Sequence, residues 1–183
     1  MGWKNVRDHY GIKHIVQIRE GRIAVGTRYV HDLIRVEFNG TVAWGCLRPS
    51  RNDELARYHA EMTADLAKLR ELIETPDTFA ASLPVYTYDG GEIVEKQCEE
   101  YGWPNCTHDG EVMFDNTFSA DKAKVVAWAK RDAELGVKFA LESIEDAETR
   151  LAEIRLRHEQ HKRDVAKLEA DHPAIKQEQD GGR

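Results

Sequence analysis

The hydrophobic pattern near the C-terminus predicts one long helix. From Val137 onward, apolar residues recur at alternating spacings of three and four, which is the heptad pattern of a coiled coil with mostly apolar a and d positions. We expect Ser119 to cap this helix and the dipeptide His172-Pro173 to end it near Asp171. The predicted seam for pairing with another helix consists of Ile144, Leu151, Ile154, His158, His161, Val165 and Leu168.

Short apolar runs in residues 14–44 predict an antiparallel β-meander. A two-residue loop at Glu20-Gly21 would pair Ile18 with Ile23 and bring the apolar side chains of both strands to one face. The dipeptide Asn39-Gly40 is typical of a second hairpin turn. A strict two-residue loop there would put the apolar side chains of the last strand on the opposite face. A bulge would correct this, so the register of that strand stays open.

The middle of the chain predicts a helix followed by a small insert. The helix covers residues 52–74, with Ser50 or Asn52 as its cap. The α/β insert covers residues 85–115. It consists of a short strand, a helix over Glu92–Tyr101 that Gly102 would end, and a second hairpin from Cys106 to Phe114. The apolar stripe of the 52–74 helix consists of Leu55, Tyr58, Met62, Leu66, Leu69 and Ile73.

These segments together predict an α+β protein. Its parts are an N-terminal antiparallel β-meander, a central helix, a small α/β insert and a long C-terminal helix of coiled-coil type. We expect residues 1–118 to form an α+β domain and residues 119–172 to form the long helix of a helical hairpin or coiled coil. Residues 173–183 are polar and predict a disordered tail.

The charges that flank the predicted seam disfavour a parallel homodimer. With Ile144 at position a, the g-to-e′ pairs between two parallel copies are all like-charged: Arg150 with Arg155, Arg157 with Lys162, and Asp164 with Glu169. Each exposed pair changes the free energy by only a few tenths of a kcal/mol, but all three act in the same direction. The sequence therefore favours an antiparallel partner, either the 52–74 helix of the same chain or a second copy.

Two histidines occupy successive seam positions. His158 and His161 could form a pH-sensitive joint or, across a dimer, a site of four histidines for a metal ion. The alternative is that the seam is partly exposed there and the histidines only interrupt its apolar stripe. We favour this alternative, because no cysteine or carboxylate completes a known metal-binding spacing. We therefore expect no metal and no cofactor.

Charge is distributed unevenly along the chain. Residues 1–51 contain nine Lys and Arg against four Asp and Glu, whereas residues 52–118 contain four against fifteen. On the predicted meander, Arg19, Arg22 and Arg35 face outward, near the aromatic residues Trp3, Tyr10 and Tyr29 in sequence. Arginines and aromatic rings on a small sheet suit contacts to phosphates and bases of nucleic acid. The alternative, which we favour, is a solvated sheet face that packs on the acidic segment.

The cysteines give little support for an enzyme. Three cysteines without a CxxC pair indicate reduced thiols in a cytoplasmic protein, and we find neither a signal peptide nor a stretch long enough to span a membrane. Cys106 and His108 could supply a nucleophile and a base. However, Asp109-Gly110 is explained as a turn and Cys106 as a small core residue, so we assign no catalytic residues.

Five segments carry a resemblance to a group of proteins: Trp3–Tyr10, Gly11–Gln17, Pro84–Gly91, Tyr101–Asn105 and Thr107–Gly110. They resemble small accessory proteins of bacterial tailed phages and prophages whose activity is not assigned. The resemblance implies a protein that is made inside a bacterial cell. Proteins of this group often bind host machinery, including defence systems. It carries over no functional residue.

These observations predict a non-enzymatic protein in the bacterial cytoplasm that binds a host protein or protein complex and inhibits or modulates it. A homodimer through the C-terminal helix is a further expected contact. The alternatives are a nucleic-acid-binding accessory protein that uses the basic sheet face, and an enzyme that uses the region of Cys106 and His108. A membrane partner is not expected.

Overall fold

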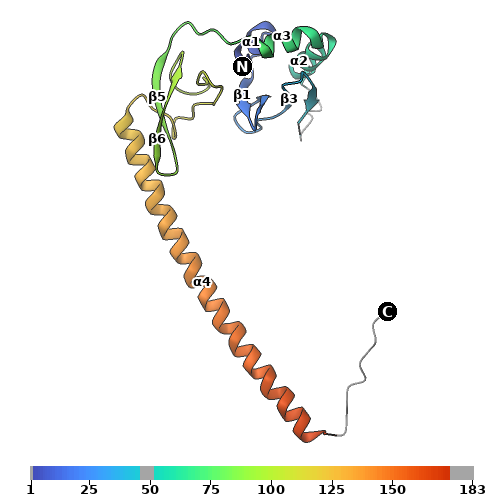
Figure 1. Ribbon diagram of the computed structural model, residues 1–183, viewed down its shortest axis with the longest axis vertical. Coiled ribbons are helices and arrows are strands. Elements are labelled where there is room, and N and C mark those ends of the chain that lie inside the picture. The colour runs from blue at the N-terminus through green and yellow to red at the C-terminus, as the bar shows by residue number, and fades with distance from the viewer. Residues whose placement is uncertain (1, 46–51, 174–183) are drawn as a thin grey trace. The chain divides into compact units, whose positions relative to one another are not determined.

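A computed structural model describes residues 2–45 and 52–173 and confirms the α+β class (Figure 1). Most of the tail predicted for residues 173–183, and the candidate cap Ser50, lie outside the described residues. The chain divides into two units, one ending at Arg131 and the other beginning at Asp132. The first unit contains the β-meander, a separate β-hairpin and three short helices.

The meander is a four-stranded antiparallel sheet. Its strands are β1 (Ile15–Arg19), β2 (Arg22–Gly26), β3 (Ile34–Val36) and β4 (Val42–Trp44), and they pair in chain order. The predicted pairing of Ile18 with Ile23 is confirmed. Because side chains alternate between the faces of a strand, this register places the apolar residues of β1 and β2 on one face, toward the core.

The last hairpin of the sheet settles the register that the sequence left open. Val36 pairs with Val42, and Ile34 with Trp44, so the apolar side chains of β4 lie on the same face as those of β3. The Glu37 amide donates a hydrogen bond to the Thr41 carbonyl (2.9 Å), and this bond closes the loop. This loop is longer than a two-residue turn. The pairing of β4 with β3 is therefore shifted by one residue from that of a strict two-residue turn, and the shift places the apolar side chains of β4 on the core face.

Three helices cover the apolar face of the sheet. They are α1 (Trp3–His9), α2 (Asp53–Ala64) and α3 (Leu66–Glu74). Helix α1 was not predicted. The single helix predicted for residues 52–74 is wrong at its centre, because Asp65 interrupts it: the Asp65 carboxylate accepts a hydrogen bond from the Lys68 amide (2.9 Å) and so caps α3. Asn52 caps α2 in the same way.

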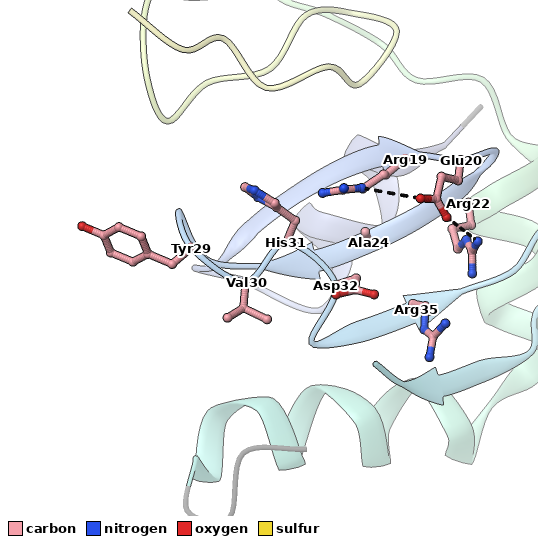
Figure 2. A pocket seen from close by; sticks show the side chains of 9 residues that line it. All are labelled: Arg19, Glu20, Arg22, Ala24, Tyr29, Val30, His31, Asp32 and Arg35. Carbon is pink, nitrogen blue, oxygen red and sulfur yellow. Dashed lines mark hydrogen bonds and ion pairs between the residues drawn. The ribbon is translucent and has the colours of Figure 1, made fainter. Parts of the chain in front are cut away.

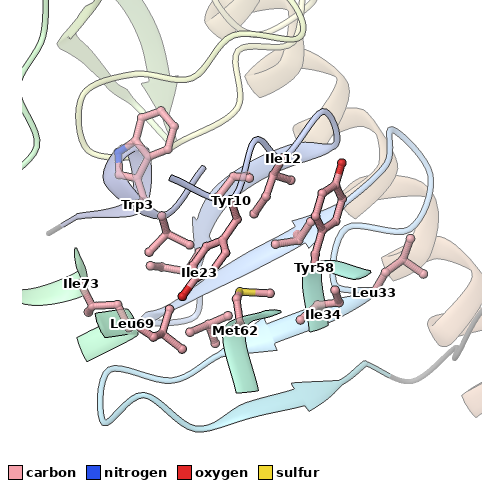
Figure 3. Packing of buried hydrophobic residues seen from close by; sticks show 14 of the residues in the cluster. Trp3, Tyr10, Ile12, Ile23, Leu33, Ile34, Tyr58, Met62, Leu69 and Ile73 are labelled. Atoms are coloured by element: carbon pink, nitrogen blue, oxygen red, sulfur yellow. The ribbon is translucent and has the colours of Figure 1, made fainter. Parts of the chain in front are cut away.

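The core lies between these helices and the inner face of the sheet. Figure 3 shows side chains from α1, α2, α3 and the strands meeting there. The three helices contribute Trp3, Val6, Leu55, Tyr58, Met62, Leu69 and Ile73, and the sheet contributes Val16, Ile23, Val25, Ile34 and Val36. The apolar stripe predicted for residues 52–74 is therefore largely buried inside the N-terminal unit.

The predicted α/β insert is a β-hairpin. Strands β5 (Leu83–Asp89) and β6 (Glu92–Cys98) pair antiparallel along their whole length. The helix predicted over Glu92–Tyr101 is wrong, because pairing with β5 overrides the local preference of a segment rich in Glu, Lys and Gln. Gly102 is not a helix cap; it occupies the left-handed region (φ +79°) in a turn closed by the Asn105 amide, which donates to its carbonyl. The second hairpin is reduced to one bridge, between Cys106 and Val112.

A loop over residues 105–113 joins the hairpin to the meander. The Ile18 amide of β1 donates to the Gly110 carbonyl (2.8 Å). On the other side, Lys96 of β6 lies 2.6 Å from an Asp109 oxygen and 2.5 Å from a Glu111 oxygen. Burial acts to lower the pKa of Lys96, but hydrogen bonds to these two carboxylates outweigh it and the pKa is raised. The loop is thus held from both sides.

Helix α1 contacts both parts. The Trp3 indole is buried in the meander core, and its Nε1 donates to the His108 carbonyl of the 105–113 loop (3.1 Å). Lys4 forms an ion pair of 2.7 Å with Glu99, which follows β6. The Gly2 amide donates to the Ile73 carbonyl of α3 (2.9 Å). This short helix therefore ties together the meander, α3 and the hairpin.

Helix α4 (Lys122–Asp171) has 50 residues and a length of about 75 Å. It ends at Asp171, as predicted. Its predicted cap is wrong: Ser119 lies before the helix, and the Asp121 carboxylate accepts hydrogen bonds from the amides of Ala123 (2.9 Å) and Lys124 (3.3 Å). Val125 is its one buried residue.

Replacement of Trp3 tests the role of α1. We expect Trp3→Ala to lower the free energy of unfolding by about 3–5 kcal/mol, because it leaves a large cavity and removes the hydrogen bond to the 105–113 loop. Urea denaturation followed by circular dichroism gives this value. Tyr29→Ala is the matched control: Tyr29 is 87% exposed, so its loss is expected to change stability by less than about 0.5 kcal/mol. Equal effects of the two changes would contradict this account of α1.

Candidate functional site

The second unit is the exposed part of α4. Every residue from Arg131 to Pro173 is exposed, including the whole predicted seam. Leu151 is 46% and Val165 is 53% exposed, so large aliphatic side chains contact water along the helix. An apolar stripe of this length on a solvated helix is typical of a surface that binds another helix.

Further apolar side chains are exposed on α4 outside the seam. Phe139 is 60% exposed and Leu156 is 71% exposed. In the heptad that places Ile144 at a, Phe139 lies at c and Leu156 at f. These two side chains lie outside the a and d stripe, so the heptad pattern did not identify them as contact residues.

The apolar stripe of residues 52–74, which the sequence offered as a partner for the seam, packs elsewhere. Leu55, Tyr58, Met62, Leu69 and Ile73 are all buried in the core of the N-terminal unit. They are therefore not available to cover α4, whose seam is exposed in the same chain.

The seam histidines are both exposed. His158 Nδ1 lies 3.5 Å from a carboxylate oxygen of its neighbour Glu159. Among the described residues, no group of three or more His, Cys, Asp or Glu side chains is placed to hold a metal ion. A site of four histidines would need two chains.

The three predicted arginines of the meander lie around one cavity. Figure 2 shows Arg19 and Arg22 at the ends of β1 and β2, and Arg35 on β3. The cavity has a volume of about 300 Å³. Besides the arginines, its lining consists of Glu20, Ala24, Tyr29, Val30, His31 and Asp32. Strand alternation predicted the arginines, whereas the loop between β2 and β3 supplies side chains that the sequence did not place there.

Carboxylates of the meander itself already contact two of these arginines. Arg22 lies 2.7 Å from Glu20 and 3.6 Å from Glu37, and Arg19 lies 4.0 Å from Glu20. Arg35 donates from Nη2 to the Trp44 carbonyl (3.2 Å), and its buried Nε has no hydrogen-bond partner within the described part of the chain. The cavity is therefore cationic but partly neutralised.

The aromatic residues expected beside this face are mostly elsewhere. Trp3 and Tyr10, which lie near the arginines in sequence, are buried in the core. Tyr29 does line the cavity, and its exposed ring lies at the end away from Glu20 (Figure 2). One ring, rather than three, is available for stacking on a base.

The thiol and imidazole considered for catalysis are held by structural contacts. Cys106 Sγ donates to the Val16 carbonyl (3.3 Å), and burial raises the pKa of its thiol to about 12. The His108 ring stacks on Phe79 at 3.8 Å between centroids, and its Nε2 lies 3.0 Å from the Ala81 carbonyl. A thiol with this pKa is protonated at neutral pH and is not an activated nucleophile.

None of the helices in residues 2–45 and 52–173 is both long and apolar enough to cross a membrane.

Comparison of this chain with protein-family models, with curated proteins and with solved structures found no match.

The environment of Cys106 predicts that its thiol reacts slowly with alkylating reagents. With a pKa of about 12, only about one molecule in ten thousand carries the thiolate at pH 8, so iodoacetamide should leave Cys106 of the native chain unmodified. The buried Cys98, whose pKa is also raised by burial, should behave alike. Peptide mass spectrometry compares native with urea-unfolded protein, in which both should react fully. Rapid labelling of Cys106 in the native chain would contradict this prediction and would favour the alternative of an enzyme that uses Cys106 and His108.

Proposed function

We propose that this chain is a non-enzymatic protein-binding protein that contacts its partner through α4. The exposed apolar seam from Ile144 to Leu168 is the observation that carries this proposal. Burial of aliphatic side chains stabilises a complex by about 25 cal/mol for each Å² removed from water. Because most apolar residues of α2 and α3 are buried in the core, they are not available to cover this seam.

The partner that we propose beyond the chain is a protein or protein complex of a bacterial host. The resemblance of Trp3–Tyr10 and Pro84–Gly91 to phage and prophage accessory proteins supports this choice, and such a protein would act in the cytoplasm by inhibiting or modulating host machinery such as a defence system. The protonated, buried thiol of Cys106 supports a binding role over catalysis.

Substitutions in the seam test the proposal. The tagged full-length chain is incubated with nuclease-treated bacterial lysate, and the bound proteins are identified by mass spectrometry. Leu151→Glu combined with Ile154→Glu should reduce the recovery of a stoichiometric protein at least about tenfold, because two charges would have to be buried in the interface.

A matched control separates this effect from a change in net charge. Thr149→Glu combined with Ala152→Glu adds the same two negative charges at positions f and b, away from the seam, and should leave recovery unchanged. Circular dichroism confirms that all variants keep their helix content. Equal recovery with the seam variant and the wild type would refute a role for α4.

A second candidate function rests on the arginine cavity. Three arginines and the exposed ring of Tyr29 line one depression, which is an arrangement suited to a phosphate and a stacked base of single-stranded nucleic acid. The carboxylates of Glu20 and Glu37 oppose it, since a bound phosphate would compete with them for Arg22. This function is therefore second to protein binding.

Oligonucleotide binding tests the second candidate. Fluorescence anisotropy with a labelled single-stranded oligonucleotide should show affinity that falls with salt, with a slope near −2 for three neutralised phosphates. Arg22→Glu should weaken binding about tenfold or more, whereas Lys130→Glu, an equal charge change outside the cavity, should not. Salt-independent or absent binding of the wild type would eliminate this candidate.

A further inference from the structure

We propose that the helix covering the seam of α4 is α4 of a second copy, antiparallel and centred near Leu156. In this register residues 141–171 of the two chains pair over about 46 Å. The inference rests on the proposed function that α4 is the contact surface. It names a second copy as the occupant of the a and d seam, so that the host partner of the proposed function contacts the paired helices. Its basis is charge complementarity along a helix whose residues are exposed from Arg131 to Pro173.

The flanking charges exclude the parallel arrangement first. With Ile144 at a, a parallel dimer forms each g-to-e′ pair twice, once on each side. Arg150 meets Arg155′, Arg157 meets Lys162′, and Asp164 meets Glu169′. All six contacts are like-charged, and none is opposite-charged.

An antiparallel dimer pairs the same residues differently, because g then faces g′ and e faces e′. Centred near Leu156, it brings Arg150 opposite Asp164′ and Glu148 opposite Lys162′, each twice by symmetry. The like-charged contacts are the two at the centre, Arg155 with Arg155′ and Arg157 with Arg157′. This register therefore has four attractive contacts and two repulsive ones.

Neighbouring registers are less favourable. A shift that shortens the overlap by one heptad keeps four attractive contacts. It also creates four like-charged contacts, because Arg155 then faces Lys162′ and Glu148 faces Glu169′, each twice. A shift that lengthens the overlap by one heptad pairs Arg150 with Arg157′ and Glu134 with Glu169′, each twice, against two attractive contacts. Among these registers, the charges select the one centred near Leu156.

The same register places the seam residues in complementary layers. Ile144 faces Leu168′, and the small Ala147 faces the larger Val165′. Each histidine faces an aliphatic residue: His161 lies opposite Leu151′, and His158 lies opposite Ile154′. In a parallel dimer each histidine would instead face its own copy. The antiparallel arrangement thus accommodates both histidines without a metal ion and without histidine–histidine layers.

One substitution should destabilise the antiparallel dimer and stabilise the parallel dimer. Lys162→Glu makes both Glu148–Lys162′ contacts repulsive in the antiparallel dimer, whereas it makes both Arg157–Lys162′ contacts attractive in a parallel one. Sedimentation equilibrium of the full-length chain should show that Lys162→Glu raises the dimer Kd about fivefold or more. Adding Glu148→Lys should restore the wild-type Kd. A tighter dimer with Lys162→Glu would overturn the antiparallel orientation.

Cross-linking tests the register independently of affinity. The variant Glu148→Cys/Lys162→Cys should form covalent dimers on oxidation, because each new thiol faces the other across the antiparallel seam. Asp164→Cys/Glu169→Cys should cross-link only in a parallel dimer, and the wild type measures the background from the native cysteines. Cross-linking of the second variant but not the first would overturn the proposal.

The oligomeric state separates this inference from the proposed function. A chain that stays monomeric at tens of micromolar overturns the second copy as occupant. If the seam variant Leu151→Glu/Ile154→Glu still loses its captured protein, the host partner covers the seam and the proposed function stands. If the chain is monomeric and the seam variant captures the same proteins as the wild type, both proposals fail.

Discussion

The burial of one indole joins the parts of the N-terminal unit. Trp3 is 3% exposed, and its Nε1 can be buried only because the His108 carbonyl accepts its hydrogen. The close approach of the chain start to α3 also depends on Gly2: a Cβ there would lie 1.7 Å from the Leu72 carbonyl oxygen. The meander and the hairpin are separate sheets with separate apolar clusters, so α1 and the 105–113 loop provide the contacts that unite them.

This internal organisation determines which side chains are used to stabilise the first unit. The apolar stripe of α2 and α3 is used in the core, and Lys96, Asp109 and Glu111 are used to hold the 105–113 loop. Cys106 and His108 are likewise engaged by backbone and ring contacts. These side chains of the first unit thus stabilise the fold, whereas a continuous series of exposed apolar side chains lies on α4.

The sequence predicted elements whose pattern is strongly periodic and failed where tertiary contacts decide. The pairing of Ile18 with Ile23 and the end of α4 at Asp171 follow from alternation and from a proline stop. Helix α1 was missed because it has seven residues and no side-chain cap, although Trp3, Val6 and Tyr10 have helical spacing. The segment of β6 contains good helix formers, and only its pairing with β5 makes it a strand.

The two candidate surfaces differ in what binding must displace. At the arginine cavity, alternation along the strands correctly gathered the arginines, but a turn with Glu20 at φ +50° brings its carboxylate to Arg22, which sequence alone could not show. An anion there must compete with existing ion pairs and gains little net free energy. On α4, the aliphatic side chains of the seam are about half exposed and form no ion pairs, so covering them meets no such competition. The same physical argument explains why protein binding through α4 ranks above nucleic-acid binding at the sheet.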